Sequence, residues 1–305
     1  MTPDEHTIQE TYIDVGDGHT LYVQEWGSPG ATVPVIFLHG GPGGSSNDQY
    51  KTSLNPSRQR AIFFDQRGCG KSLPCGSREH NTTADLVEDI EKIAAHLRLA
   101  SFILHGTSWG SCLALAYALR YPKRVHAMVL SGIFTGSQTE IDWINQGGFR
   151  DFFPEQWEAY LAQTPKSHRH DPSTYHYKHA LGTDASAAKA SAYAYKNLEA
   201  SVVGLDDRFT PKPFEEFDPG GAQIEMYYLA NRCFMPDRFI LKNAHKLAMP
   251  VWIVQGRYDF VCPPRTAYEL HQALPDCHLI WTTSGHRGER ETWNVMRTIL
   301  AQLTA

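Results

Sequence analysis

The sequence of 305 residues lacks the features that mark membrane-bound, nucleic-acid-binding or disulfide-stabilised proteins. No apolar run approaches the ~20 residues of a membrane-spanning helix, and residues 1–6 carry neither the basic patch nor the apolar core of a secretory signal. Asp and Glu number 33 against 28 Lys and Arg, so there is no basic footprint for nucleic acid. Six cysteines without paired close spacings indicate reduced thiols. We therefore expect a cytoplasmic protein that binds neither nucleic acid nor membranes, and composition leaves its oligomeric state open.

The hydrophobic pattern predicts an α/β fold with a mostly parallel sheet. Continuous apolar runs, typical of strands buried on both faces, lie at 33–38, 61–64, 102–104, 127–130, 251–254 and 278–281. Residues 10–26 predict two strands joined by a turn at Gly16-Asp17-Gly18. A helix is expected to begin near Thr82 and Thr83. Strands that alternate with helices indicate βαβ units, whose ligands bind at the carboxyl ends of the strands.

The stretch from about 135 to 247 breaks this alternation. It is rich in aromatic residues, has an alanine-rich helical segment around 184–200, and contains no convincing buried strand. We interpret it as a helical cap, 135–247, inserted into a core made of 1–134 and 248–305. Caps of this kind exclude water from a site and shape its specificity.

A serine lies at a turn between a predicted strand and a predicted helix. Ser108 is the centre of Gly106-Thr-Ser-Trp-Gly110, which is Gly-x-Ser-x-Gly in its strand–turn–helix context. Asp259 and His286 each follow a later predicted strand, so all three side chains are expected at one edge of the sheet. The order Ser, Asp, His is that of α/β-hydrolases. We predict that His286 takes the proton of Ser108 and that Asp259 orients the imidazole.

A glycine-rich turn follows the first buried strand. His39-Gly-Gly-Pro-Gly43 lets a backbone N–H approach a substrate where a Cβ would clash. The amides of Gly41 and Trp109 are therefore predicted to form an oxyanion hole, in which each donor contributes roughly 3–4 kcal/mol. The alternative is a turn that merely ends the strand.

Several motifs together resemble the proline iminopeptidases, also called prolyl aminopeptidases. They are His39-Gly-Gly-Pro-Gly43, Asp65-Gln-Arg-Gly-Cys-Gly-Lys-Ser72, Ser108-Trp-Gly-Ser111, Gly256-Arg-Tyr-Asp259 and Gly285-His286. The resemblance covers nearly the whole chain, from the hairpin near Asp17 onward. It implies an α/β-hydrolase that removes N-terminal proline with the triad Ser108, Asp259 and His286, without a cofactor or metal.

The resemblance also implies residues that bind the substrate. Glu199 and Glu225 align with glutamates of the family, and enclosed carboxylates hold a cationic amine by charge-assisted hydrogen bonds. Without the resemblance, either glutamate would be an ordinary solvated helix residue. The side-chain pocket is predicted from Phe134, Ile144, Tyr228 and Leu229. Ile144 and Leu229 stand where the family has aromatic residues, which favours a more aliphatic pocket.

We therefore predict a serine aminopeptidase that releases an N-terminal residue, proline or another small or apolar one, from short peptides. The main alternative is an esterase, lactonase or amidase of the same fold, with Glu199 and Glu225 only structural. A silenced hydrolase used for binding is a third possibility. Residues 68–72 resemble part of a phosphate-binding loop but lack its first glycine. Cys262 matches a family cysteine, and it could be either reachable by bulky thiol reagents or buried and inert.

Overall fold

An eight-stranded sheet organises the chain in the computed structural model, which describes residues 5–205 and 209–305. The spatial order is β1-β2-β4-β3-β5-β6-β7-β8. The strands are β1 (Thr7–Gly16), β2 (His19–Gly27), β3 (Val35–Leu38), β4 (Arg60–Phe64), β5 (Phe102–Thr107), β6 (Val125–Ser131), β7 (Val251–Gly256) and β8 (Cys277–Thr282). Strands β3 to β8 run parallel, and the β1–β2 hairpin joins β4 in antiparallel register. The predicted α/β-hydrolase fold is confirmed.

Both faces of the sheet are covered, which explains the continuous apolar runs of its strands. Val35 and Phe37 of β3 point to the face packed by α10 (Glu289–Leu303), whereas Ile36 and Leu38 point to the opposite face. That opposite face is covered by α1 (Thr83–His96), α2 (Trp109–Arg120) and α9 (Pro264–Ala273). Helix α1 begins at a capping box in which the Thr82 side chain accepts from the Asp85 amide.

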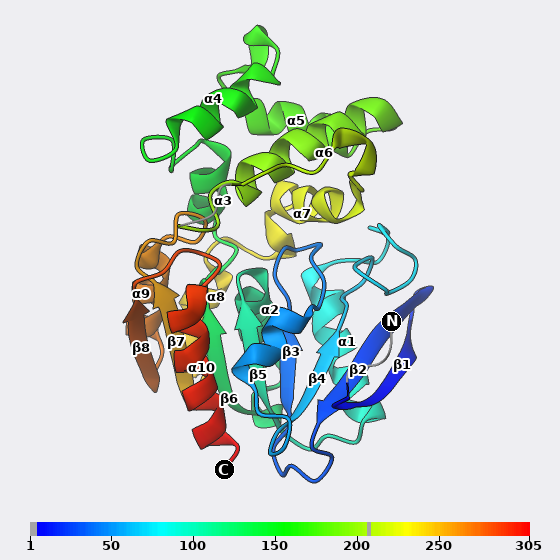
Figure 1. Ribbon diagram of the computed structural model, residues 1–305, viewed down its shortest axis with the longest axis vertical. Coiled ribbons are helices and arrows are strands. Elements are labelled where there is room, and N and C mark those ends of the chain that lie inside the picture. Colours follow the sequence, from blue (N-terminus) through cyan, green and yellow to red (C-terminus); the bar gives the residue numbers. More distant parts are fainter. Residues whose placement is uncertain (1–4, 206–208) are drawn as a thin grey trace.

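In its described residues, the segment between β6 and β7 forms helices joined by loops and contains no strand. It contains α3 (Gln138–Asn145), α4 (Pro154–Ala162), α5 (Pro172–Ala180), α6 (Ala185–Ala200), α7 (Gly220–Ala230) and α8 (Phe239–Asn243). In Figure 1, α3 to α7 form a layer above the sheet. Helix α8 instead contacts α2 and α9 beside the sheet, although it lies within the range 135–247. The division into core and cap stays a prediction.

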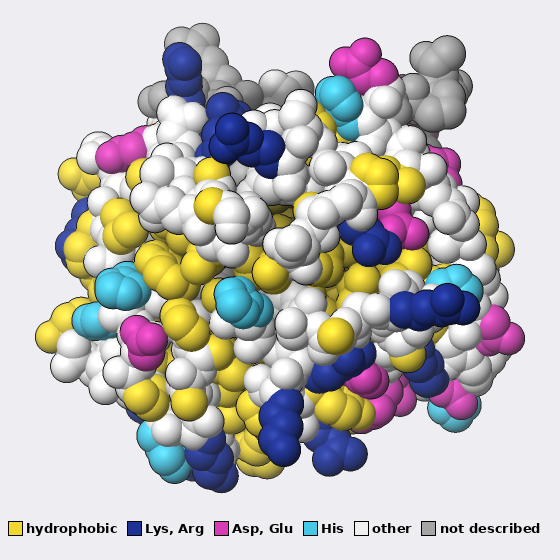
Figure 2. All heavy atoms as spheres, turned by 90° about the horizontal axis from the view of Figure 1, so that it is seen from below, with side chains coloured by type: hydrophobic (Ala, Val, Ile, Leu, Met, Phe, Trp, Pro, Cys, Tyr) yellow, Lys and Arg dark blue, Asp and Glu magenta, His cyan; other side chains and the backbone are white. Residues whose placement is uncertain are grey.

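Six short 3-10 segments complete the described structure. They are η1 (Asp48–Ser53), η2 (Pro122–Arg124), η3 (Lys166–His168), η4 (Phe214–Glu216), η5 (Arg232–Phe234) and η6 (Ala244–Lys246). Within the described ranges, no helix is both long and apolar enough to cross a membrane. Figure 2 shows the end of the molecule opposite α3 to α7. There Lys and Arg side chains are interspersed with Asp and Glu, and neither sign of charge dominates this face.

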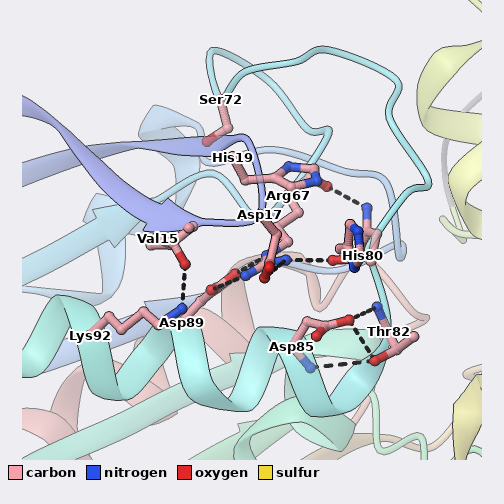
Figure 3. A network of polar contacts seen from close by, with 12 residues as sticks. Val15, Asp17, His19, Arg67, Ser72, His80, Thr82, Asp85, Asp89 and Lys92 are labelled. Carbon is pink, nitrogen blue, oxygen red and sulfur yellow. Dashed lines mark hydrogen bonds and ion pairs between the residues drawn. The ribbon is translucent and has the colours of Figure 1, made fainter.

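A buried arginine joins three segments beside the glycine-rich turns (Figure 3). Arg67 is 1% exposed, and its guanidinium donates to both carboxylate oxygens of Asp89 in α1, at 2.7 and 2.8 Å. It also donates to the carbonyl of His80 at 2.5 Å and to Asp17 in the β1–β2 turn at 3.3 Å. Nearby, the Asp65 carboxylate accepts from backbone amides in two loops, each at 2.8 Å. These bonds fix the loops at this end of β4.

We predict that Arg67→Met lowers the free energy of unfolding by about 3–5 kcal/mol, because it leaves Asp89 charged and buried without a partner. The matched control is Arg120→Met, since Arg120 forms an exposed pair with Glu88 at 3.7 Å and such pairs contribute about 0–1 kcal/mol. Urea unfolding followed by far-UV circular dichroism measures both. Equal losses in the two variants would contradict the structural role given to the Arg67–Asp89 pair.

Candidate active site

The turn that carries Ser108 is set by close backbone packing. Strand β5 ends at Thr107 and α2 begins at Trp109, so Ser108 is the single residue between them, with φ 56° and ψ −127°. A side chain larger than hydrogen does not fit at the flanking glycines. A Cβ on Gly110 would lie 2.0 Å from the Leu38 carbonyl oxygen, and one on Gly106 would lie 2.3 Å from the Gly110 oxygen. The Gly-x-Ser-x-Gly spacing is therefore a steric requirement, and the strained turn presents the serine hydroxyl.

Ser108, His286 and Asp259 form a continuous chain of hydrogen bonds. His286 Nε2 lies 3.1 Å from Ser108 Oγ, and His286 Nδ1 lies 2.9 and 3.1 Å from the two carboxylate oxygens of Asp259. Asp259 follows β7 and His286 follows β8, so parallel strands bring them to the edge where β5 delivers Ser108. This geometry suits proton transfer from the hydroxyl to the imidazole. The catalytic roles stay a prediction.

A buried glutamine that the sequence analysis did not single out holds Asp259 in place. Gln255, which is fully buried, donates to Asp259 Oδ2 at 3.1 Å and accepts from the Ile133 amide at 2.9 Å. Asp259 Oδ1 accepts from the amides of Val261 and Cys262, at 3.0 and 2.7 Å. Each carboxylate oxygen of Asp259 thus accepts at least one hydrogen bond in addition to its contact with His286. The available signal was a polar residue at the end of an otherwise apolar strand.

The surroundings of His286 favour its protonated form. Burial alone would lower the pKa of His286, but the charge of Asp259 and the hydrogen bond to it outweigh burial and raise that pKa. The charge of Glu199 adds to the increase, and the charge of Lys196 opposes it. A raised pKa makes the imidazole a stronger acceptor for the serine proton.

The predicted oxyanion donors lie beside Ser108. Gly41 lines the same cavity as Ser108, and a Cβ on the neighbouring Gly40 would lie 3.2 Å from the Ser108 Cβ. Trp109 is the first residue of α2, where N–H groups have no partner within the helix. Its buried indole donates to Gln66 at 2.9 Å. The arrangement is compatible with an oxyanion hole, which stays a prediction.

The two predicted amine-binding glutamates lie together, and a lysine lies between them. Lys196 and Glu199 belong to α6 and Glu225 belongs to α7. Lys196 Nζ donates to the Glu199 carboxylate and, at 3.1 Å, to Glu225 Oε2. Lys196 and Glu199 line the cavity of about 340 Å³ that also holds Ser108 and His286. Lys196 was not predicted, because nothing in the helical pattern of 184–200 sets it apart.

The two carboxylates and the ammonium lie in contact at the edge of the cavity, and this proximity shifts the pKa of each group. Burial and the charge of Glu199 raise the pKa of Glu225 to about 8, although Lys196 opposes the increase. Burial also disfavours the charged form of Glu199, but the charge of Lys196 outweighs it and lowers the pKa of Glu199. Desolvation would lower the pKa of Lys196, but the charges of the two carboxylates outweigh it and raise that pKa. Of the two carboxylates, Glu199 therefore holds its negative charge more readily than Glu225.

The residues predicted for the side-chain pocket are buried, at 0–7% exposure: Phe134, Ile144, Tyr228 and Leu229. Within the described chain, none of them lines the cavity at Ser108. The Tyr228 hydroxyl donates to Asn81 at 2.8 Å, and its ring packs edge-on against Trp109. Leu229 lines a different cavity, of about 920 Å³, together with residues of α3, α4 and α5. The role of these four residues at a substrate stays a prediction.

Comparison with known proteins identifies the fold and the family. A family model described as the alpha/beta hydrolase fold matches residues 33–286. A probable proline iminopeptidase of Leptolyngbya boryana is 40% identical over 280 residues, covering 89% of this chain and 86% of that protein. A proline iminopeptidase of Arabidopsis thaliana is 39% identical over 289 residues, covering 90% and 74%. The solved structure of a thermophilic esterase from Thermogutta terrifontis is similar in fold, with a TM-score of 0.65 and 18% identity over 97% of this chain and 100% of that one.

These matches define first the class of protein and then the family. The fold and the extent of the family match make the chain a serine hydrolase with the α/β-hydrolase fold. Within that class the chain belongs to the proline iminopeptidase family, as the motifs at residues 39–43 and 65–72 predict. The likeness to the esterase shows the fold alone.

We predict that Gly110→Ala lowers the free energy of unfolding by about 1–3 kcal/mol, because the new Cβ overlaps the Leu38 carbonyl. It should also lower kcat/KM on a small activated ester by roughly 10²-fold, the loss that a 1 Å misplacement of a reacting group can cause. The control is Gly30→Ala, since a Cβ at Gly30 meets nothing within 4 Å. Urea unfolding and initial rates measure both effects. An unchanged rate in Gly110→Ala would show that the turn tolerates the displacement.

We predict that kcat/KM falls as the pH drops through the raised pKa of His286, because only the neutral imidazole accepts the serine proton. Glu199→Gln removes a charge that raises this pKa, so the acid limb of the profile should move to lower pH. The control Glu215→Gln removes an exposed charge and should leave the limb in place. Hydrolysis of 4-nitrophenyl acetate across the acid and neutral range measures the limb without a titrating substrate amine. A limb unmoved by Glu199→Gln would contradict the assigned coupling.

Proposed function

We propose that this chain is an aminopeptidase that releases an N-terminal residue, proline or another small apolar one, from short peptides. The observation that carries the proposal is an ammonium group held between Glu199 and Glu225 at the cavity of Ser108. The substrate of an aminopeptidase has the same group, because its N-terminal amine is charged at neutral pH. The relatives named as proline iminopeptidases support this substrate class.

In the proposed mechanism Ser108 attacks the carbonyl carbon of the first residue. His286 takes the proton from Ser108 Oγ and then gives it to the leaving amine of the second residue, and Asp259 stabilises the imidazolium. The amides of Gly41 and Trp109 donate to the tetrahedral oxyanion. Water activated by His286 then hydrolyses the ester between Ser108 and the released residue.

The cavity limits what can bind. Its volume of about 340 Å³ is near the lower end of small-molecule sites, which are about 300–1,000 Å³. We propose that residues 135–247 act as the cap that encloses it, so that long peptides are excluded. From the composition we further propose a cytoplasmic enzyme that acts on small peptides without a nucleic-acid or membrane partner.

The second candidate is an esterase, lactonase or amidase that does not read a free amine. A neighbour with this fold is an esterase, and Ser108, His286 and Asp259 would serve both chemistries. In this alternative Lys196, Glu199 and Glu225 only join α6 to α7. The two candidates differ in whether loss of a carboxylate affects substrates with an amine more than substrates without one.

We predict that Glu199→Gln and Glu225→Gln each lower kcat/KM on L-proline 4-nitroanilide by well over about tenfold. Losing the charged partner of a buried ammonium costs about 2–5 kcal/mol, and each ~1.4 kcal/mol is a factor of ten. Hydrolysis of 4-nitrophenyl acetate, which has no amine, should change little at a pH above the acid limb of the profile, because Ser108, His286 and the two backbone amides remain.

Two controls accompany this test. Ser108→Ala should remove both activities while leaving the melting temperature unchanged, and Glu215→Gln should affect neither. Equal losses on both substrates in the Glu199 and Glu225 variants would mean that the glutamates only support the helices. No loss on either substrate, together with equal turnover of N-acetyl-proline 4-nitroanilide, would favour the esterase.

A further inference from the structure

Lys196 separates Glu225 from the cavity at Ser108. Glu225 is 3% exposed and is not among the described residues that line the cavity, whereas Lys196, bonded to it at 3.1 Å, lines the cavity with Glu199. The Lys196 side chain is itself 38% exposed, so its flexible stem has room to move toward solvent. The lysine therefore covers the deeper carboxylate from the side on which a substrate arrives.

The position of Lys196 has a direct chemical consequence. A substrate ammonium needs the same carboxylate oxygens to which Lys196 Nζ already donates, because both groups are cations that donate hydrogen bonds, three from a lysine ammonium and two from a protonated proline amine. A substrate with an amine must displace Lys196 or share its partners. A substrate whose nitrogen is acylated, or an ester without nitrogen, can enter while Lys196 keeps both carboxylates bonded.

We propose that Lys196 is a specificity-determining residue: its ammonium fills the amine subsite of the free enzyme and extends the substrate class to neutral acyl compounds, such as N-blocked amides and simple esters. The inference rests on the proposed amine site at Glu199 and Glu225. Removing the lysine would favour substrates with a free amine and disfavour neutral substrates. The carboxylates would gain an ammonium substrate as their only cation, and a neutral group would meet an uncompensated charge.

The cluster differs from an ordinary helix-surface ion pair. Lys196 and Glu199 are three residues apart on α6, a spacing that alone stabilises a helix only weakly. The same ammonium, however, also reaches Glu225 on α7, which a surface pair would not do. A purely structural lysine would tie α6 to α7 without changing which ligands bind, and the following experiment separates the two roles.

The experiment measures ligand binding without turnover. Titration calorimetry in a Ser108→Ala background compares prolinamide, which carries the ammonium, with N-acetylprolinamide, which is neutral. Adding Lys196→Met should lower the Kd of prolinamide by about tenfold or more, equivalent to about 1.4 kcal/mol, and should leave the Kd of N-acetylprolinamide unchanged or higher. If Lys196→Met changes the ratio of the two Kd values by less than about twofold from its value in Ser108→Ala alone, the proposal is overturned.

Three further variants make the result specific. Lys196→Arg keeps a cation between the carboxylates, so it should retain the ratio of Kd values measured with Lys196. If Lys196→Arg instead increased the preference for prolinamide as much as Lys196→Met does, the proposal would be overturned. Lys189→Met removes the same charge two turns earlier on α6, outside the cavity, and should have no effect. If Lys196→Met does not fold, as judged by its melting curve, Lys196→Gln carries the test. Its neutral amide can still donate to the carboxylates.

Turnover separates this inference from the proposed function. With Ser108 present, Lys196→Met should raise the ratio of kcat/KM for proline 4-nitroanilide over N-acetyl-proline 4-nitroanilide by about tenfold, mainly through a lower KM for the free amine. If the parent enzyme and Lys196→Met prefer the free amine equally, the proposed aminopeptidase function is supported and the proposed role of Lys196 is wrong. If the Kd ratio shifts as expected but neither enzyme hydrolyses the free amine, Lys196 controls the amine subsite and the proposed peptidase function is wrong.

Discussion

The close approach of helix α2 to strand β3 is the constraint on which the reactive geometry depends. At Gly110 the helix backbone lies so near the Leu38 carbonyl that a Cβ would fall 2.0 Å from it. The β5–α2 turn must then be a single strained residue, and Ser108 takes that conformation. The same packing points the start of α2 at the serine, and the free N–H groups and positive dipole end of a helix favour negative charge there. His286 is held against the other side of this turn, since a Cβ on Gly132 would lie 3.2 Å from its ring.

Two electrostatic systems meet at His286. Asp259, fixed by Gln255 and two backbone amides, raises the pKa of the imidazole from within the core. Glu199 raises it from α6, and Lys196 on the same helix opposes that increase. The inserted helices therefore affect the proton affinity of His286, although the residues that hold its Asp259 partner belong to the sheet side of the site.

The sheet, and the edge of the sheet at which Ser108, Asp259 and His286 lie, could be predicted from the sequence because both follow from local patterns. Each strand buried on both faces is a continuous apolar run, and Ser108, Asp259 and His286 each follow such a run. The Lys196 cluster could not be predicted in the same way. It depends on how α6 packs on α7, with Lys196 and Glu225 on different helices, and no periodicity encodes that contact. The interior positions of Phe134, Ile144, Tyr228 and Leu229 likewise follow from tertiary packing of the helical segment, whereas alignment with a family only matches residue types.

The two groups of site residues come from different parts of the chain, so a lysine at position 196 can occur without loss of the hydrolytic residues. Ser108, Asp259 and His286 come from the ends of sheet strands, while Lys196, Glu199 and Glu225 come from helices inserted between β6 and β7. A substitution on α6 can thus change the acyl group that is accepted without moving the reacting atoms. Exchange of one ammonium for another also preserves the charge near His286. Under the role proposed for Lys196, a substrate amine that replaced it would still neutralise Glu199, and Lys196 would stay in place when a neutral substrate binds. The imidazole would then keep a similar proton affinity in both complexes, so one base would serve both kinds of substrate.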